Sequence, residues 1–89
     1  MNQVKEIENT LHLSDLKIGD EAVIESFENQ EENLIRLGDM GLHKGIAFRV
    51  INFAPLGDPI EIKIRGFYLS IRKSQAKHIR VNKKKNGGQ

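Results

Sequence analysis

The chain has 89 residues, of which 38% are hydrophobic and 29% are charged, and this composition indicates one small globular domain. Its length leaves no room for the two lobes of a larger enzyme, and no apolar run approaches the roughly 20 residues that span a bilayer. Cysteine is absent, which excludes disulfides, thiolate metal ligands and cysteine catalysis. The N-terminus lacks the basic and then apolar pattern of a secretory signal, so we expect a cytoplasmic protein.

Charge is distributed unevenly along the chain. Residues 1–35 contain nine acidic and two basic side chains, whereas residues 36–89 contain three acidic and twelve basic ones. Such a division favours an anionic partner for the basic half. The alternative is that the two halves pair with each other across the folded surface, and the sequence leaves both interpretations open.

The first third of the chain predicts a helical turn and one strand. Residues 1–10 are polar and are expected to be flexible, so the folded domain begins near residue 11. A short helical turn is expected around Ser14 and Asp15, followed by a tight turn at Gly19 and Asp20. Residues 22–27 are rich in β-branched and aromatic side chains, which predicts a strand.

A helix is expected next, with Asn29 as its N-cap. Glu32 follows three positions later and completes the pattern of a capping box. The apolar stripe at helical spacing is formed by Leu34, Ile35, Leu37 and Met40.

The end of this helix carries a glycine signal. Gly41 stands where a left-handed residue commonly ends a helix, and Leu42 is placed to fold back on Leu37 in a Schellman motif. Gly38 inside the helix costs about 1 kcal/mol relative to alanine. We therefore expect a neighbouring element packed closely against the backbone at Gly38.

The second half of the chain predicts short antiparallel strands. Residues 46–51, 60–65 and 67–72 alternate between apolar and polar side chains, which is typical of half-buried strands. A helical turn over residues 74–77 and a closing strand over 79–81 follow. These elements predict a mainly β fold, a small antiparallel barrel of about five strands with one or two short helices over residues 11–82, closed or nearly closed and followed by a flexible basic tail over residues 83–89.

Two segments resemble one known family. Residues 36–45 (RLGDMGLHKG) resemble its R-L-x-x-M-G-L-x-x-G pattern, and residues 54–66 (APLGDPIEIKIRG) resemble its A-P-L-G-D-P signature. The flanking segments agree with the same family, so that the resemblance covers residues 11–82. The chain thus resembles the FeoA family, the small cytosolic component of bacterial ferrous iron transport, and the resemblance implies an SH3-like barrel.

The resemblance also implies a function in protein binding. FeoA-like proteins are associated with FeoB, a membrane permease whose cytosolic part carries a G domain, and are thought to be accessory or regulatory factors and not enzymes. We therefore expect no catalytic residue, attachment to the membrane only through the partner, and the possibility of self-association. The candidate partner-binding residues are apolar or polar residues in loops or at the ends of elements: Met40, Leu42, His43, Pro55, Leu56, Asp58 and Tyr68. For Leu56 the alternative is that it covers the open end of the barrel as part of the core.

Nucleic-acid binding is the competing hypothesis from another class. Basic residues such as Arg65, Arg72 and Lys73 are able to follow a phosphate backbone, as small barrels often do. Aromatic residues are only 6% of the chain, and Tyr68 is the one clearly placed on an outer face. Stacking of bases needs several exposed rings, so no nucleic-acid partner is expected.

A metal carrier is a third hypothesis. The three histidines include no pair at helical spacing, and His78 lies close to Lys77 and Arg80, whose charge opposes a cation. Asp39 and His43 are able to meet at the helix end, and a metal carrier would depend on His43. We expect neither a metal site nor another cofactor.

Overall fold

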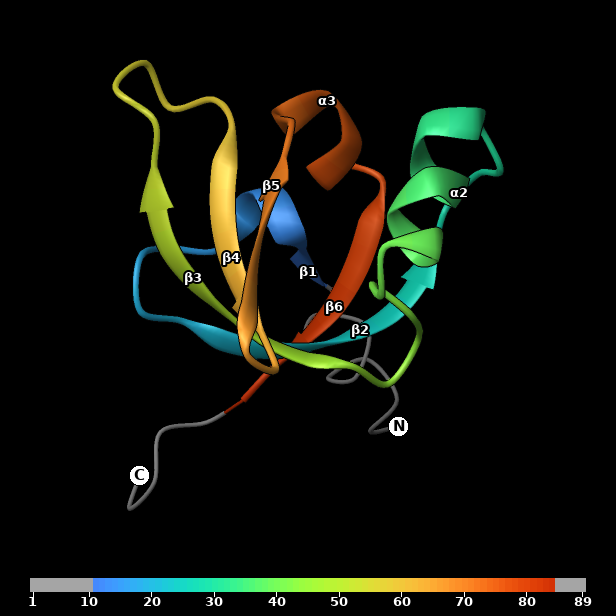
Figure 1. Cartoon of the computed structure of the whole chain (residues 1–89), viewed down its shortest axis with the longest axis horizontal. Helices are drawn as coiled ribbons and strands as arrows, with labels where there is room; N and C mark the ends of the chain where they lie inside the picture. The colour runs from blue at the N-terminus through green and yellow to red at the C-terminus, as the bar shows by residue number, and fades with distance from the viewer. Residues whose placement is uncertain (1–10, 85–89) are drawn as a thin grey trace, which may run out of the picture.

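Figure 1 presents the computed structural model of the chain, which describes residues 11–84. The predicted flexible segment 1–10 and residues 85–89 of the predicted tail lie outside the described residues, whereas Lys83 of that tail lies in the last strand and pairs with Ala22. Along the chain the elements are β1 (Leu11–His12), the 3-10 helix η1 (Leu13–Asp15), β2 (Glu21–Phe27), α2 (Glu32–Asp39), β3 (Ala47–Phe53), β4 (Ile60–Ile64), β5 (Phe67–Ile71), α3 (Lys73–Ala76) and β6 (Ile79–Lys83).

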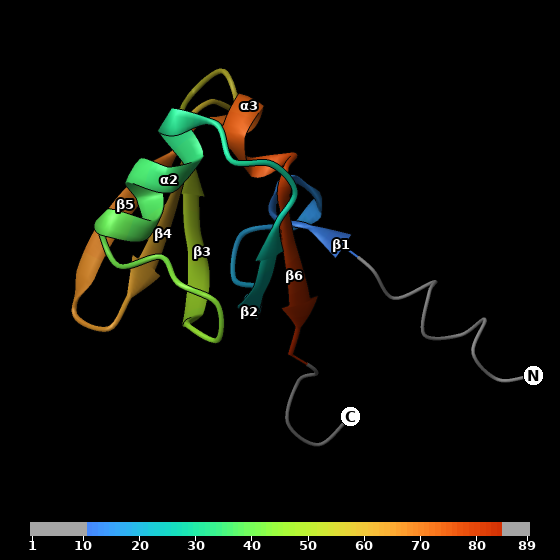
Figure 2. The same cartoon turned by 90° about the vertical axis from the view of Figure 1, so that its right-hand side faces the viewer.

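The strands form one antiparallel sheet that coils into a barrel, as Figures 1 and 2 show. The strand order is β1-β6-β2-β3-β4-β5, so β1 and β5 are the edges, and no ladder joins them within the described part of the chain. The prediction of a mainly β barrel is confirmed. The six strands include one more than expected, β1, whose Leu11 and His12 pair with Val81 and Arg80.

Alternation along the strands builds the core. On β4, Ile60, Ile62 and Ile64 are buried, whereas Lys63 between them is exposed. Each isoleucine removed from water contributes about 1.5–3 kcal/mol. Side chains from the helices join the same cluster, which consists of Leu13, Leu16, Ala22, Ile24, Leu34, Leu37, Leu42, Phe48, Val50, Ile60, Ile62, Ile64, Ile71, Ala76, Ile79 and Val81.

The predicted start of α2 is wrong by two residues. The helix begins at Glu32, and its N-cap residue is Glu31, which makes no side-chain capping bond. Asn29 instead accepts a hydrogen bond at Oδ1 from the backbone N–H of Glu31 at 2.9 Å. This bond to the residue two positions ahead is an Asx turn, so Asn29 shapes the connection before the helix.

The predicted end of α2 is confirmed. The N–H of Leu42 donates to the carbonyl of Leu37 at 3.0 Å and that of Gly41 donates to Gly38 at 2.9 Å, which is the Schellman pattern. Gly41 has a φ of 111°, and a Cβ on it would lie 3.2 Å from the Phe67 ring. Glycine is therefore required here by both conformation and space.

Gly38 differs from the expectation. A Cβ at Gly38 would have no heavy atom within 4 Å outside its own helix. The described residues thus contain no close neighbour of the kind predicted, and they leave this side of α2 open.

Two contacts fix α2 to the rest of the barrel. The Phe67 ring of β5 lies against Gly41 at the end of the helix, and Nε2 of Gln75 in α3 donates to the Asn33 carbonyl at 3.2 Å. Figure 1 shows α3 between α2 and the upper part of β5. The end of the helix thus reaches the edge strand through the Phe67 ring.

Candidate contact site

The predicted partner-binding residues fall in three places. Met40, Leu42 and His43 lie at the exit of α2, residues 55–58 lie in the β3–β4 loop, and Tyr68 lies on β5. The β4–β5 ladder runs from the pair Ile60–Ile71 at the loop end to Ile64–Phe67 at the turn, with Tyr68 one pair away from the turn. Tyr68 and the β3–β4 loop are therefore at opposite ends of this ladder and do not form one patch.

A groove of about 290 Å³ runs along α2. Its apolar lining includes Ile35, which is 53% exposed, and the open side of Gly38. The complete lining is Phe27, Asn29, Gln30, Leu34, Ile35, Gly38, Leu42, His43 and Lys44. The predicted residue His43 is thus placed at the rim of an apolar groove.

Met40 and Leu42 have different environments although they are two positions apart. Met40 follows the last helical residue as the C-cap and is 48% exposed. Leu42 is fully buried in the core, because the Schellman turn directs it back toward Leu37. Leu42 therefore supports the groove from inside and is not an accessible contact residue.

The β3–β4 loop presents Leu56 to solvent. Its side chain is 94% exposed, so the alternative in which Leu56 covers the end of the barrel is wrong. Asp58 has a structural contact, since its Oδ1 accepts a hydrogen bond from the backbone N–H of Lys73 at 2.9 Å. This bond joins the loop to the first residue of α3.

Tyr68 lies on the outward face of the sheet. The ring is 54% exposed, and Nζ of Lys63 on the neighbouring strand lies 5.6 Å from its centroid, within the range of a cation–π interaction. The ring of Tyr68 is therefore held beside a cation and is not a free stacking platform.

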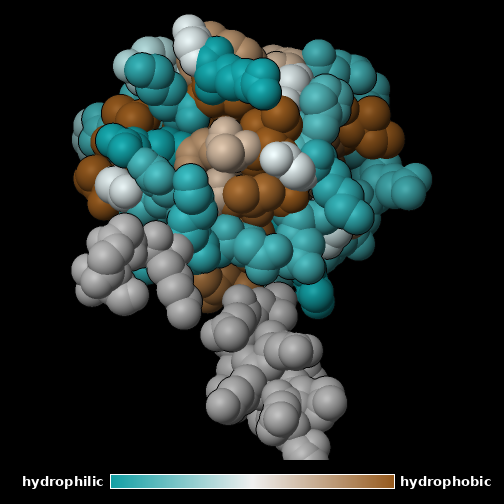
Figure 3. All heavy atoms as spheres, turned by 90° about the horizontal axis from the view of Figure 1, so that it is seen from below, coloured by the Kyte–Doolittle hydropathy of each residue, from teal (hydrophilic) through white to brown (hydrophobic). Residues whose placement is uncertain are grey.

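Seen from below, the molecule has an apolar area surrounded by hydrophilic side chains (Figure 3).

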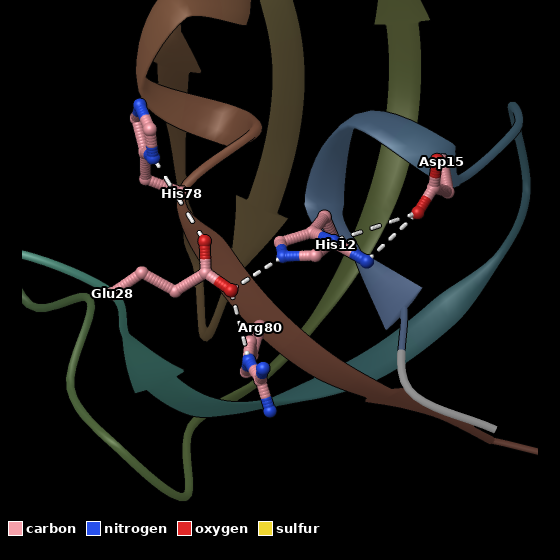
Figure 4. Close-up of polar contacts among 5 residues, drawn as sticks. All are labelled: His12, Asp15, Glu28, His78 and Arg80. Atoms are coloured by element: carbon pink, nitrogen blue, oxygen red, sulfur yellow. Dashed lines mark hydrogen bonds and ion pairs between the residues drawn. The ribbon is translucent and has the colours of Figure 1, made fainter. Parts of the chain in front are cut away.

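A charged cluster around Glu28, drawn in Figure 4, was not predicted from the sequence. Its Oε2 lies 2.7 Å from Nε2 of His12 and accepts a hydrogen bond from Nε of Arg80 at 2.9 Å. Its Oε1 lies 3.8 Å from Nδ1 of His78. The hydrogen bond from His12 and the next largest effect, the hydrogen bond from Arg80, lower the pKa of the Glu28 carboxyl group from 4.5 to about 2.

Ion pairs across β2 join the acidic and the basic halves of the chain. The pairs are Asp20–Lys83, Glu21–Arg49, Glu21–Lys84 and Glu28–Arg80. The interpretation in which the halves pair is therefore confirmed along this strand. Lys63 and Arg65, by contrast, form no ion pair with any residue from 11 to 84.

The hypothesis of a metal carrier finds no donor cluster to support it in the described residues. Within residues 11–84, no three His, Cys, Asp or Glu side chains are arranged so that they could hold a metal ion. His43 is exposed, and no hydrogen bond or ion pair links it to Asp39 in this part of the chain.

No helix among residues 11–84 combines the length and the apolar character needed to cross a membrane.

The comparison with known proteins agrees with the fold. The family model of the FeoA domain matches residues 11–83. The chain is 39% identical to an FeoA protein from Chlorobium tepidum whose structure superimposes with a TM-score of 0.78, covering 88% of this chain and 76% of that one. An FeoA from Stenotrophomonas maltophilia in complex with zinc, described as a prokaryotic SH3 domain protein, is 27% identical with a TM-score of 0.69, covering 84% of this chain and 96% of that one.

A longer relative places this domain in a larger protein. An Fe(2+) transport protein A/Fe(2+) transporter FeoB fusion protein from Porphyromonas gingivalis is 35% identical over 71 residues. The match covers 80% of this chain and 8% of that protein, so the chain spans a small part of its length. Because the family model matches nearly all of the described residues, the chain belongs to the FeoA family, which is linked to ferrous iron transport, and its fold is an SH3-like barrel.

Proposed function

We propose that the chain is a non-enzymatic accessory protein of ferrous iron uptake that docks in the cytoplasm on the cytosolic part of a FeoB-type transporter. The observation that carries this proposal is the fusion protein, in which the two components form one chain. Fusion gives two modules a high effective concentration for each other. Natural linkage of this kind supports association between the separate components.

The groove along α2 is the proposed docking surface. Gly38 lowers the stability of the helix by about 1 kcal/mol relative to alanine, yet nothing in the described structure packs against it. An approaching partner side chain would use the open space beside the helix backbone. Ile35 supplies exposed apolar area in this space and His43 supplies a polar rim, while Met40 is exposed at the end of the helix outside the groove lining.

The β3–β4 loop is proposed as a second contact. Pro55 and Leu56 are exposed, and Leu56 adds a large apolar side chain where a solvated loop would carry a polar one. Asp58 keeps the loop attached to α3 through Lys73. Since Gln75 of α3 also bonds Asn33 of α2, the short helix connects the loop to the groove-bearing helix.

The proposed mechanism is a bias on the conformation of the partner. A protein that binds one state of the transporter's G domain, or of its connection to the membrane, shifts the equilibrium by the difference in affinity between the states. This mechanism requires no bond making on the accessory protein. The chain would then be peripheral to the membrane through its partner alone.

Calorimetric titration with the purified cytosolic part of the transporter tests the proposal. We expect saturable binding of the chain, with an affinity that differs between the GDP-bound and the GTP-analogue-bound partner. Absence of binding in every nucleotide state would contradict the proposed function.

A further inference from the structure

A row of side chains crosses the outward face of the sheet. The strand registers place Glu21 opposite Arg49, Arg49 opposite Lys63, and Lys63 opposite Tyr68. Like charges directly opposite each other on neighbouring strands repel; the ion pair with Glu21 offsets the charge of Arg49, whereas Lys63 has no carboxylate partner among residues 11–84. The uncompensated charge of Lys63 beside Arg49 points to a role in binding an anion.

The row lies in a groove of about 540 Å³, which we call the basic groove. Ala47 and Ile51 of β3 form its apolar floor, because they share the outward face of that strand with Arg49. The strand order places β2 and β6 on one side of β3, where they form one wall of the groove. It places β4 and β5 on the other side, where they form the second wall. The lining is Glu21, Ala47, Phe48, Arg49, Ile51, Lys63, Arg65, Gly66, Tyr68 and Lys84.

Cations outnumber carboxylates in this groove. Four basic side chains face a single acid, Glu21, which bonds Nε of Arg49 at 3.1 Å and lies 3.8 Å from Nζ of Lys84. Lys63 and Arg65 on the other wall have no carboxylate partner within residues 11–84. One wall is thus partly neutralised, and the other wall carries free positive charge.

We propose that the basic groove binds an acidic segment of a partner protein in which an apolar side chain is flanked by carboxylates. The apolar side chain would rest on the floor at Ala47 and Ile51, and the carboxylates would reach Lys63 and Arg65. The surface is separate from the groove along α2, and the two linings share no residue.

The same observations disfavour the other anionic partners. A nucleic acid would need several exposed rings for stacking, whereas this groove holds Tyr68, whose ring already faces Lys63. A phosphodiester also gains nothing from an apolar floor. A bilayer surface is flat and does not enter a groove between walls of side chains.

The probe is a short fluorescent peptide with a central leucine flanked by glutamates, and binding is measured by anisotropy at low ionic strength. Two control peptides replace the glutamates by glutamines or the leucine by glycine. We expect the acidic leucine peptide to bind the full chain more tightly than either control, because both the charges and the apolar contact contribute.

Variants locate the binding site. The double substitution of Lys63→Glu and Arg65→Glu should weaken peptide binding about tenfold or more. Lys77→Glu is an exposed control from the end of α3, outside the groove, and should change affinity much less. Ala47→Leu fills the floor without changing charge and should also weaken binding, and circular dichroism checks that each variant is folded.

Several outcomes would overturn the proposal. One is that the acidic leucine peptide does not bind. Another is that Lys77→Glu loses as much affinity for the peptide as the double variant does. The third is that a single-stranded oligonucleotide or phosphatidylserine vesicles bind more tightly than the peptide. Ile35→Asp separates this result from the proposed docking along α2, because it should weaken binding to the transporter and leave peptide binding unchanged.

Discussion

Nε2 of His12 lies 2.7 Å from Oε2 of Glu28, and this contact joins the first strand of the barrel to the end of β2. The same oxygen accepts a hydrogen bond from Arg80 of β6. One carboxylate therefore connects three segments that are far apart in the sequence. Its hydrogen bonds lower its pKa to about 2, which makes its contribution to stability dependent on pH.

Glu28 should stabilise the fold above its ordinary pKa and lose that effect in acid. The folded pKa lies below the unfolded value of 4.5, so the contribution is complete above about pH 4.5 and disappears as the pH falls toward 2. Unfolding in urea is measured for the wild type and for Glu28→Gln across this range. The wild type should be the more stable protein near neutral pH, and the difference should vanish at the acid end. A difference that is independent of pH would refute the assignment.

Gly41→Ala should destabilise the protein by about 1–3 kcal/mol, which is typical of an unfavourable backbone conformation. The cause is the φ of 111° together with the Phe67 ring, 3.2 Å from the new Cβ. Thermal or urea unfolding measures the change. An unchanged free energy of unfolding would show that the end of α2 adapts without cost.

Gly38→Ala should have the opposite effect on stability. The helix gains about 1 kcal/mol from the higher helix propensity of alanine, and the added methyl group meets no heavy atom within 4 Å from outside the helix in residues 11–84. If a partner uses the open side of the helix, the same variant should bind the transporter more weakly while it unfolds at a higher urea concentration. Stronger stability with unchanged binding would place the docking surface elsewhere.

Ile62→Ala should cost about 2–5 kcal/mol, as large-to-small substitutions in a packed core do. Ile62 is fully buried in the centre of β4. Leu56→Ala is the matched control, because Leu56 is exposed in the loop, and it should change stability by less than about 0.5 kcal/mol. Comparable losses in the two variants would contradict the described core.

The sequence predicted the strands and the end of α2 because their signals are local. Alternation on residues 60–64 directly reports which face is buried, whereas on β5 it fails at Phe67, which is 44% exposed; Gly41 marks a conformation that few other residues adopt. β1 was missed because a strand of two residues is too short to show an alternation of apolar and polar side chains. The helix start was misplaced because an asparagine serves equally as an N-cap and in an Asx turn, as Asn29 does here.

The candidate site was less predictable than the fold. Leu42 was predicted both to fold back on Leu37 and to contact a partner; the turn that ends α2 confirms the first prediction and returns the side chain to the core. The basic groove and the Glu28 cluster depend on which strands become neighbours, and contacts such as Glu28 with Arg80 cross 52 residues of chain. No local spacing carries that information. The resemblance to the family supplied the functional link that the residues alone did not.

The affinity of the chain for the cytosolic part of the transporter tests the central claim most directly, measured for the wild type, Ile35→Asp and Ile18→Asp. Both isoleucines are more than half exposed, but of these two only Ile35 belongs to the lining of the groove along α2. The account predicts tight binding by the wild type and by Ile18→Asp and a loss of about tenfold or more for Ile35→Asp. Equal affinities for all three proteins, or no binding by the wild type, would contradict it.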